Sequence, residues 1–214
     1  PGLILIEPSF HTNFKLGSFG DTVVLTKADG TTVDKIATGP MYVDISKGRH
    51  PQGLPGQWYF EYATPGSANT SSALQEFSAP VSMEPPAGAL TSGETITLSH
   101  AVPGAEIRYT LDGSDPTGSS PLYTTPLTRN GVYQVVRARA FESNKWPSWP
   151  TTSSYFGNVS SEVVTFSLVT DPDNLWDPNI GIYENFSEDW ERPVHVEMFE
   201  PDGSMRMALD AGIR

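Results

Sequence analysis

The chain has 214 residues and a formal net charge of −12, from 25 acidic side chains and 13 lysines and arginines. This charge disfavours nucleic acid and anionic membrane surfaces as partners, because both bind basic surfaces. The chain has no cysteine, which excludes disulfides, thiolate metal sites and cysteine nucleophiles. No segment approaches the roughly 20 apolar residues that cross a bilayer, so membrane insertion is not expected. The 19 glycines and 19 prolines indicate short strands and many turns.

The first segment, residues 1–70, begins with an apolar run at Leu3–Ile6 and then shows short strand patterns. Asp29 and Gly30 predict a tight hairpin turn, since glycine tolerates a positive φ. Ser46–Gly56 is expected to be a loop. The strands expected in this segment are Asp21–Thr26, Thr32–Ile36, Met41–Ile45 and Gln57–Tyr62.

The second segment, residues 77–168, follows a stretch of small and polar residues that is typical of a linker. Apolar and polar residues alternate in several short runs with glycine and proline between them, which predicts an antiparallel sandwich. The expected strands are Glu94–Ser99, Glu106–Leu111, Tyr133–Phe141 and, closing the sandwich, Val163–Leu168.

The third segment, residues 169–214, begins with the loop Asp171–Pro178. His195–Glu200 and Met205–Leu209 flank a turn and predict a β-hairpin. A single hairpin is only marginally stable, so we interpret this segment as the opening of a truncated third domain. The predicted fold class is all-β: tandem immunoglobulin-like β-sandwiches followed by a loop and a β-hairpin.

Sequence motifs in the first segment resemble the bacterial, secreted form of the lamin-tail domain. The matching pieces are Gly20–Leu25, Ala28–Asp34, Ser46–Gly53, Trp58 and Thr64–Asn69. The resemblance implies an immunoglobulin-like sandwich, whose opening strand is incomplete in this chain.

The second segment resembles the immunoglobulin-like domain at the C-terminus of chitobiase and related hexosaminidases. The specific pieces are Ile107–Thr117, Ser120–Tyr123 and Val136–Phe141. In that family the domain is an accessory to the catalytic part, so the resemblance implies no catalytic residue here.

The third segment resembles the N-terminal edge of the spore-coat CotH family of kinase-like proteins, in Gly181–Asn185, Arg192–Glu197 and Asp202–Arg214. The catalytic residues of that family lie beyond this edge, and none can be carried over onto this sequence. Together the three resemblances imply one large exported bacterial polypeptide, secreted or held at the cell surface.

Two groups of aspartates are candidates for a calcium site, because Ca²⁺ prefers oxygen ligands. They are Asp112 with Asp115, and Asp171 with Asp173 and Asp177. The preferred interpretation of the first group is a turn, since aspartate side chains accept hydrogen bonds from nearby backbone N–H groups. For the second group it is a rigid linker, indicated by Pro172 and Pro178. Calcium remains the alternative, and no other cofactor is expected.

Aromatic residues in a stretch rich in proline, serine and threonine are candidates for glycan contact, because flat rings stack on sugars. They are Trp146, Trp149 and Tyr155. The preferred alternative is that these rings pack at the end of the sandwich or against a neighbouring domain.

The sequence lacks the motifs of common catalytic sites. It contains no His-Glu-x-x-His zinc motif, no Gly-x-Ser-x-Gly elbow and no phosphate-binding P-loop. We therefore expect a non-catalytic structural or adhesive module that mediates protein assembly or spacing. Its partners would be proteins or further copies, joined through the edges of the sandwiches. The alternatives are an accessory region that binds a polysaccharide and the N-terminal appendage of a kinase-like enzyme.

Overall fold

The computed structural model describes residue 16 and residues 20–39, 45–50, 56–157 and 162–214. The predicted apolar run Leu3–Ile6 and residues 41–44 of the predicted strand Met41–Ile45 lie outside these ranges. The chain divides into two compact units, Pro1–Glu76 and Phe77–Arg214, and each is described by itself.

The first unit contains the predicted hairpin. Strand β1 (Thr22–Thr26) pairs antiparallel with β2 (Thr32–Ala37). In the turn, the Thr31 backbone N–H donates to Asp29 Oδ1 at 2.9 Å. Gly30 has a φ of +85°, so this position needs the conformational freedom of glycine. The Asp29–Gly30 hairpin prediction is confirmed.

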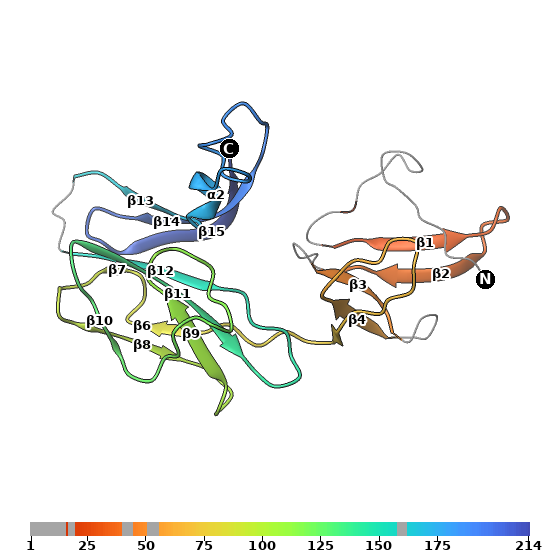
Figure 1. Cartoon of the computed structure of the whole chain (residues 1–214), viewed down its shortest axis with the longest axis horizontal. Coiled ribbons are helices and arrows are strands. Elements are labelled where there is room, and N and C mark those ends of the chain that lie inside the picture. Colours follow the sequence, from red (N-terminus) through yellow and green to blue (C-terminus); the bar gives the residue numbers. More distant parts are fainter. Residues whose placement is uncertain (1–15, 17–19, 40–44, 51–55, 158–161) are drawn as a thin grey trace. The chain divides into compact units, whose positions relative to one another are not determined.

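A second sheet of this unit has the order β3–β4–β5 (Figure 1). Its strands are β3 (Ser46–Arg49), β4 (Gln57–Phe60) and β5 (Ala73–Leu74). The loop predicted at Ser46–Gly56 is therefore wrong for its first four residues. Strand β3 forms because its backbone pairs with the aromatic strand β4, and the polar side chains of β3 give no sign of this pairing.

The second unit begins with a two-layer sandwich. One sheet has the order β10–β8–β6 and the other has the order β7–β12–β11–β9. The first sheet consists of β6 (Ser82–Glu84), β8 (Thr95–Ser99) and β10 (Leu127–Thr128). The second consists of β7 (Gly88–Ala89), β9 (Glu106–Thr110), β11 (Tyr133–Phe141) and β12 (Thr151–Phe156).

The alternating residues of these strands fill the space between the two sheets. Ile96 and Leu98 of β8 face Val136, Ala138 and Ala140 of β11 in one buried cluster. The buried positions of both strands are apolar and alternate with positions that are exposed or partly exposed, as the period of two in a strand requires. The predicted all-β, sandwich-type fold class is confirmed.

The last part of the second unit is a three-stranded sheet with the order β13–β14–β15. Its strands are β13 (Thr165–Val169), β14 (Arg192–Phe199) and β15 (Met205–Ile213). The predicted hairpin is confirmed as β14–β15. The prediction that Val163–Leu168 closes the second sandwich is wrong, because β13 pairs with β14. The predicted boundary after residue 168 therefore falls inside β13.

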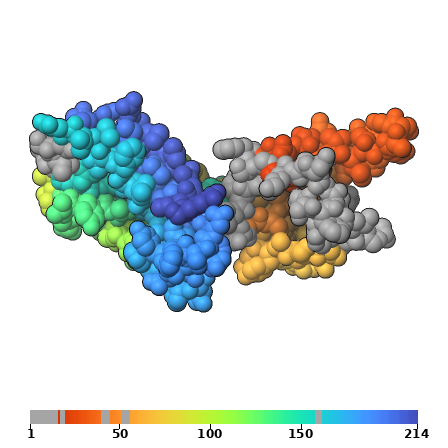
Figure 2. Space-filling view, turned by 90° about the horizontal axis from the view of Figure 1, so that it is seen from above, coloured from red at the N-terminus to blue at the C-terminus, as the bar shows by residue number. Residues whose placement is uncertain are grey.

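Between β13 and β14 the chain makes a single helical turn, α2 (Asp173–Trp176), and a series of turns. Residues 170–190 form a projection of this unit, light blue in Figure 2. In the part of the chain that the structure describes, no helix has the length and hydrophobicity of a membrane span.

Side-chain contacts attach this three-stranded sheet to the sandwich. Ser167 Oγ of β13 lies 2.7 Å from Ser154 Oγ of β12. The rings of Phe199 on β14 and Phe156 on β12 meet edge to face at 4.9 Å. At the hairpin turn, the Ala89 backbone N–H donates to the Gly203 carbonyl at 3.1 Å. The sheet is thus a third layer on the outside of β12 (Figure 1).

Candidate functional site

The register of the β13–β14–β15 sheet assigns each side chain to one of two faces, because directly opposed residues of antiparallel strands share a face. The inner face, which meets β12, consists of the rows Thr165–Phe199–Met205, Ser167–Glu197–Ala208 and Val169–His195–Asp210. The outer face consists of the rows Phe166–Met198–Met207, Leu168–Val196–Leu209, Val194–Ala211 and Arg192–Ile213.

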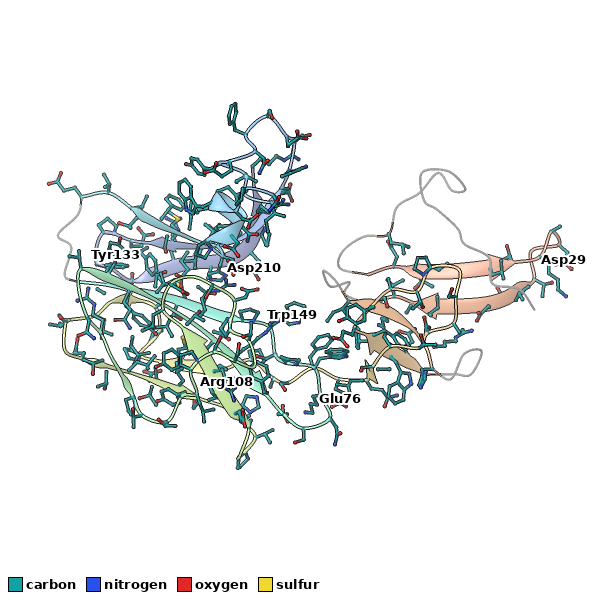
Figure 3. All side chains as sticks on the ribbon, in the orientation of Figure 1. Asp29, Glu76, Arg108, Tyr133, Trp149 and Asp210 are labelled. Carbon is teal, nitrogen blue, oxygen red and sulfur yellow. The ribbon has the colours of Figure 1, made fainter. Side chains whose placement is uncertain are left out.

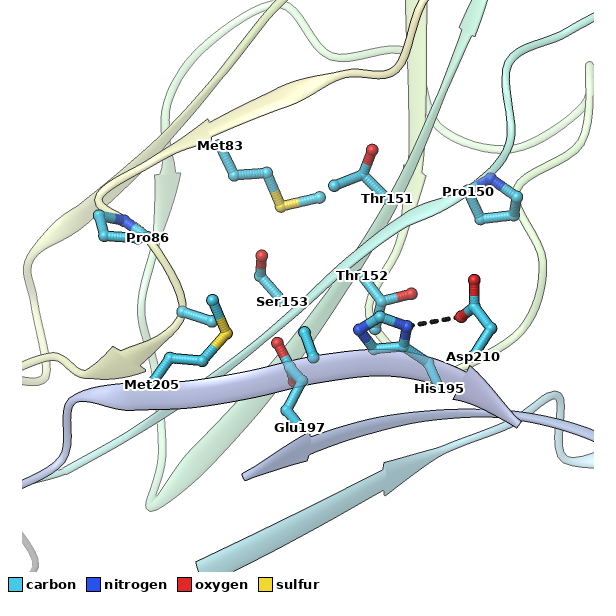
Figure 4. Close-up of a pocket in the computed structure, with 12 residues that line it drawn as sticks. Met83, Pro86, Pro150, Thr151, Thr152, Ser153, His195, Glu197, Met205 and Asp210 are labelled. Carbon is cyan, nitrogen blue, oxygen red and sulfur yellow. Dashed lines mark hydrogen bonds and ion pairs between the residues drawn. The ribbon is translucent and has the colours of Figure 1, made fainter. Parts of the chain in front are cut away.

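A pocket of about 370 Å³ lies between the inner face and the sandwich. The pocket runs along residues 150–153. Strand β7 pairs only with Tyr155 and Phe156, so it leaves this first part of β12 open. In Figure 4 the side chains of Pro86 and Met205 lie at one end, and those of Pro150 and Asp210 lie at the other. The lining residues are Met83, Pro86, Ala87, Pro150, Thr151, Thr152, Ser153, His195, Glu197, Met205, Ala208 and Asp210.

Two titratable side chains of β14 point into this pocket. His195 Nδ1 lies 2.7 Å from Asp210 Oδ1 on the neighbouring strand. Glu197 is only 1% exposed. His195 Nε2 and Glu197 Oε2 are both buried, and neither has a hydrogen-bond partner in the protein. Buried polar atoms nearly always have partners, so two such atoms in one pocket mark it as a candidate binding site.

The surroundings of Glu197 change its acidity. Burial raises the pKa of the Glu197 carboxyl group, while the hydrogen bonds from Ser154 and the charge of His195 act in the opposite direction. Burial also raises the pKa of Tyr155 to about 12, and this hydroxyl donates to the Pro85 carbonyl at 2.9 Å. Burial in the pocket therefore disfavours the ionised form of the Glu197 carboxyl group.

The outer face has the opposite character, since nine of the ten residues that the register assigns to it are apolar. Arg192 at one end is its charged residue, and Val194 beside it is buried. Phe166 and Leu168 are 55% and 58% exposed, and Met207 and Leu209 are 38% and 40% exposed. Strand β15 lies at the edge of the sheet, and in the described ranges no strand pairs with its free backbone edge. Contiguous apolar surface of this kind is typical of an interaction site.

The structure separates the three aromatic residues that were predicted to contact glycans. Tyr155 is fully buried in the sandwich core, so the prediction for this ring is wrong. Trp146 forms a bridge to Phe77 through its backbone. Trp149 lies in the connection between β11 and β12 (Figure 3), where its ring is 5.5 Å from the ring of Phe77. The packing alternative describes Trp149 in part, because the residue is still 37% exposed.

Sequence reasoning missed a second group of aromatic residues, in the projection formed by residues 170–190. Trp176 and Tyr183 stack with their ring centroids 4.7 Å apart, and both are more than half exposed. Phe186 nearby in sequence is also exposed. Sequence reasoning could not pair Trp176 with Tyr183, because the chain between them forms turns and not a regular helix. The spacing of the two residues therefore gives no signal of their contact.

Of the aspartates considered for calcium, Asp112, Asp171 and Asp177 accept hydrogen bonds and Asp115 pairs with an arginine. Asp112 Oδ1 accepts from the backbone and hydroxyl of Ser114, and Asp177 Oδ1 accepts from two backbone N–H groups. Asp171 accepts from the backbone of Asp173 and, at 3.1 Å, from that of Asp115. These are the contacts of aspartate turns.

The two aspartate groups also meet, through a hydrogen bond from the Asp115 backbone to Asp171. Asp115 Oδ1 lies 2.5 Å from Arg137 Nη1, and Asp171 caps the Asp115 backbone, so the structure brings the two predicted groups side by side. Within the described ranges, no cluster of three or more acidic or histidine side chains has the geometry of a metal site. The geometry favours turns that attach residues 112–115 to the start of the projection.

Comparison with known families agrees with the sandwich of the second unit. Residues 85–154 match the model of the chitobiase/beta-hexosaminidase C-terminal domain. The match begins just before β7 and ends inside β12, so it contains most of the sandwich strands. No curated protein and no solved structure matches the chain.

The family match supports one of the three resemblances, at residues 85–154, and is consistent with an accessory domain there. The lamin-tail resemblance of the first segment and the spore-coat resemblance of the third segment stay predictions. The pocket is lined by residues inside and outside the matched range. Thr151–Ser153 lie inside it, and His195 and Glu197 lie outside it.

Proposed function

We propose that this chain is a non-catalytic assembly module of a large secreted or cell-surface bacterial protein, and that two copies associate through the outer face of the β13–β14–β15 sheet. The observation that carries the proposal is the apolar composition of this open face. The family match at residues 85–154 supports the non-catalytic part of it.

The difference in solvent exposure between the two faces of the sheet supports this proposal energetically. Glu197 is buried against the sandwich, while Phe166, Leu168, Met207 and Leu209 of the outer face remain open to solvent. Burial of a large apolar side chain contributes about 1.5–3 kcal/mol, so covering these four side chains would stabilise an assembly substantially. An open face of this kind is expected to be covered in the working form of the protein.

A second copy fits the outer face because a flat apolar face is complementary to itself. Two such faces can stack about 10 Å apart around a two-fold axis, as the sheets of a sandwich do. Arg206 and Asp210 are the two charged residues of β15, and by register Asp210 belongs to the inner face. The residues of β15 that the register assigns to the outer face, Met207, Leu209, Ala211 and Ile213, are uncharged. Arg206 lies at the bulge of the hairpin, where it pairs with Glu200.

Sedimentation velocity of the 214-residue chain over a range of concentrations tests this proposal. The expected result is a monomer–dimer equilibrium. The double substitution Phe166→Ser with Leu168→Ser is expected to weaken the dimer about 100-fold, because it removes two large buried side chains from the contact. The matched control is Val132→Ser with Tyr133→Ser, which changes two residues of the same unit that are 77% and 78% exposed.

Two outcomes would contradict the proposal. A chain that stays monomeric at all concentrations does not self-associate through this face. A dimer that is weakened equally by the control pair uses another surface.

A second candidate function, glycan binding, is favoured by the exposed Trp176–Tyr183 stack and by the partly exposed Trp149. Rings of this kind provide the flat apolar surface on which a sugar ring stacks. Co-sedimentation with an insoluble polysaccharide such as chitin tests it. Binding that Trp176→Ala or Trp149→Ala reduces several-fold would move this function ahead, and no co-sedimentation would remove it.

A further inference from the structure

We propose that the pocket between β12 and the inner face of the β14–β15 hairpin binds a small uncharged ligand with neighbouring hydroxyl groups, about the size of one sugar ring. This site is separate from the outer face and from the exposed aromatic residues. It adds a ligand to the module and does not depend on the assembly proposed above.

The unpaired atoms of β14 are the main evidence. His195 Nε2 and Glu197 Oε2 are both buried without a hydrogen-bond partner, and both residues line the pocket. Figure 4 shows the His195 ring and the Glu197 carboxyl group on the same side of β14, facing Thr152 and Ser153 of β12. A ligand that bonds both atoms would remove two unfavourable features of the fold at once.

The chemistry of these atoms selects hydroxyl groups. The contact with Asp210 favours a proton on His195 Nδ1, so Nε2 is an acceptor when the ring is neutral and a donor when it is charged, and a hydroxyl group can bond it in either form. Burial raises the pKa of Glu197, and a protonated carboxyl group both donates and accepts. A hydroxyl group also donates and accepts, so neighbouring hydroxyls can satisfy both side chains. The hydroxyls of Thr151–Ser153 add partners along the same wall.

The remaining walls favour a ligand with an apolar face and no negative charge. Met83, Pro86, Pro150 and Met205 present carbon and sulfur atoms that can pack on the C–H groups of a ring. The flexible methionine side chains allow this wall to adapt. The carboxylate of Asp210 would repel an anion. The volume of about 370 Å³ is at the small end of ligand pockets.

Histidine NMR signals of the full chain test this proposal with glucose and N-acetylglucosamine as probes and glucuronate as the anionic comparator. The His195 ring signals are expected to move saturably, with a dissociation constant in the millimolar range that is usual for so small a ligand. Glucuronate is expected to bind at least about tenfold more weakly. His100 is the internal reference, because its Nε2 already bonds the Ala79 carbonyl at 3.0 Å.

Two variants connect the signal to the pocket. Glu197→Gln keeps the shape of the side chain but places an amide where Oε2 or its hydroxyl stands, and about tenfold weaker binding is expected. Ala208→Leu, on the exposed strand β15, fills the pocket and is expected to abolish binding. Ala211→Leu on the outer face of the same strand is the matched control, and it is expected to leave the affinity unchanged.

Three results would overturn the proposal. If no probe moves the His195 signals, water alone occupies the pocket. If glucuronate binds as well as glucose, the predicted selectivity is wrong. If Ala208→Leu binds with unchanged affinity, the probe binds elsewhere.

Discussion

The two faces of the β13–β14–β15 sheet differ in a way that reverses the usual rule for a strand. The inner face, packed on the sandwich, carries Glu197 and His195, and the outer face carries the exposed side chains of Phe166 and Leu168. Alternation with a period of two normally places the apolar set in the core. The polar set lies in the contact with the sandwich and the apolar set lies outside it, as the proposed assembly through the outer face requires.

The inner face is held by a few close contacts. Phe199 is fully buried and meets Phe156, and Gly203 in the hairpin turn lies against Ala89. The polar residues between these two anchors line the pocket. The inner face therefore attaches the sheet to the sandwich, and the outer face has no such contact with it. Substitutions on each face test this difference.

The largest effect is expected from Phe199→Ala on the inner face. Removal of a fully buried ring costs about 3–5 kcal/mol, because the lost contacts are not replaced. The matched substitution Phe166→Ala on the outer face, where the ring is 55% exposed, is expected to cost less than about 1 kcal/mol. Urea unfolding of the monomer, followed by tryptophan fluorescence, measures both changes.

Similar costs for the two phenylalanines would show that the two faces are equally buried and would remove the distinction. The measurement reports mainly on the second unit, because four of the five tryptophans follow residue 77. Low protein concentration keeps association through the outer face out of the result.

A smaller effect is expected from Gly203→Ala in the hairpin turn. Gly203 has a φ of +84°, and an added Cβ would lie 2.5 Å from the Ala89 Cβ. The strained backbone and the clash together are expected to cost about 2–3 kcal/mol. Hydrogen exchange is the second measurement, because the Ala89 amide, which bonds the Gly203 carbonyl, should lose its protection.

Gly93→Ala is the control for this substitution. Gly93 also has a positive φ, of +95°, but nothing lies within 4 Å of an added Cβ. Its expected cost is therefore the backbone term alone, about 1 kcal/mol. Equal costs at the two glycines would mean that the turn does not attach the sheet to the sandwich.

The sequence predicted those parts of the fold whose signals are local. The Asp29–Gly30 turn, the alternating strand β8 and the β14–β15 hairpin all follow from residues that are neighbours in the chain. The partner of β13 could not be predicted in this way. Val163–Leu168 reads as a strand, but the choice between β14 and the sandwich depends on contacts between residues far apart in sequence.

The pocket is the clearest feature that sequence reasoning missed. The alternation of His195, Glu197 and Phe199 with Val194, Val196 and Met198 marks a strand with two different faces. Composition alone would place histidine and glutamate in solvent, and the structure places them against β12. The prediction for Tyr155 fails for a related reason. The polar residues around it suggest an exposed loop, but residues 151–156 form the buried strand β12.

The smallest effect is expected in the pH dependence of Glu197→Gln. Burial raises the pKa of Glu197 in the folded chain above its ordinary value of 4.5, so the folded state binds more protons than the unfolded state between the two values. The contribution of Glu197 to the free energy of unfolding is therefore greatest below pH 4.5, falls as pH rises through the raised pKa, and is constant above it. Glutamine does not titrate and lacks this fall.

Urea unfolding of both proteins from about pH 4 to pH 8 measures this difference. The stability of the native chain relative to Glu197→Gln should decline as pH rises across this range. Carboxyl groups with lowered pKa values, such as Asp112, have the opposite dependence, but they are present in both proteins and cancel in the comparison. A difference that is independent of pH would mean that the Glu197 carboxylate is solvated or paired in the folded state, and the inner face would then no longer hold a buried acid.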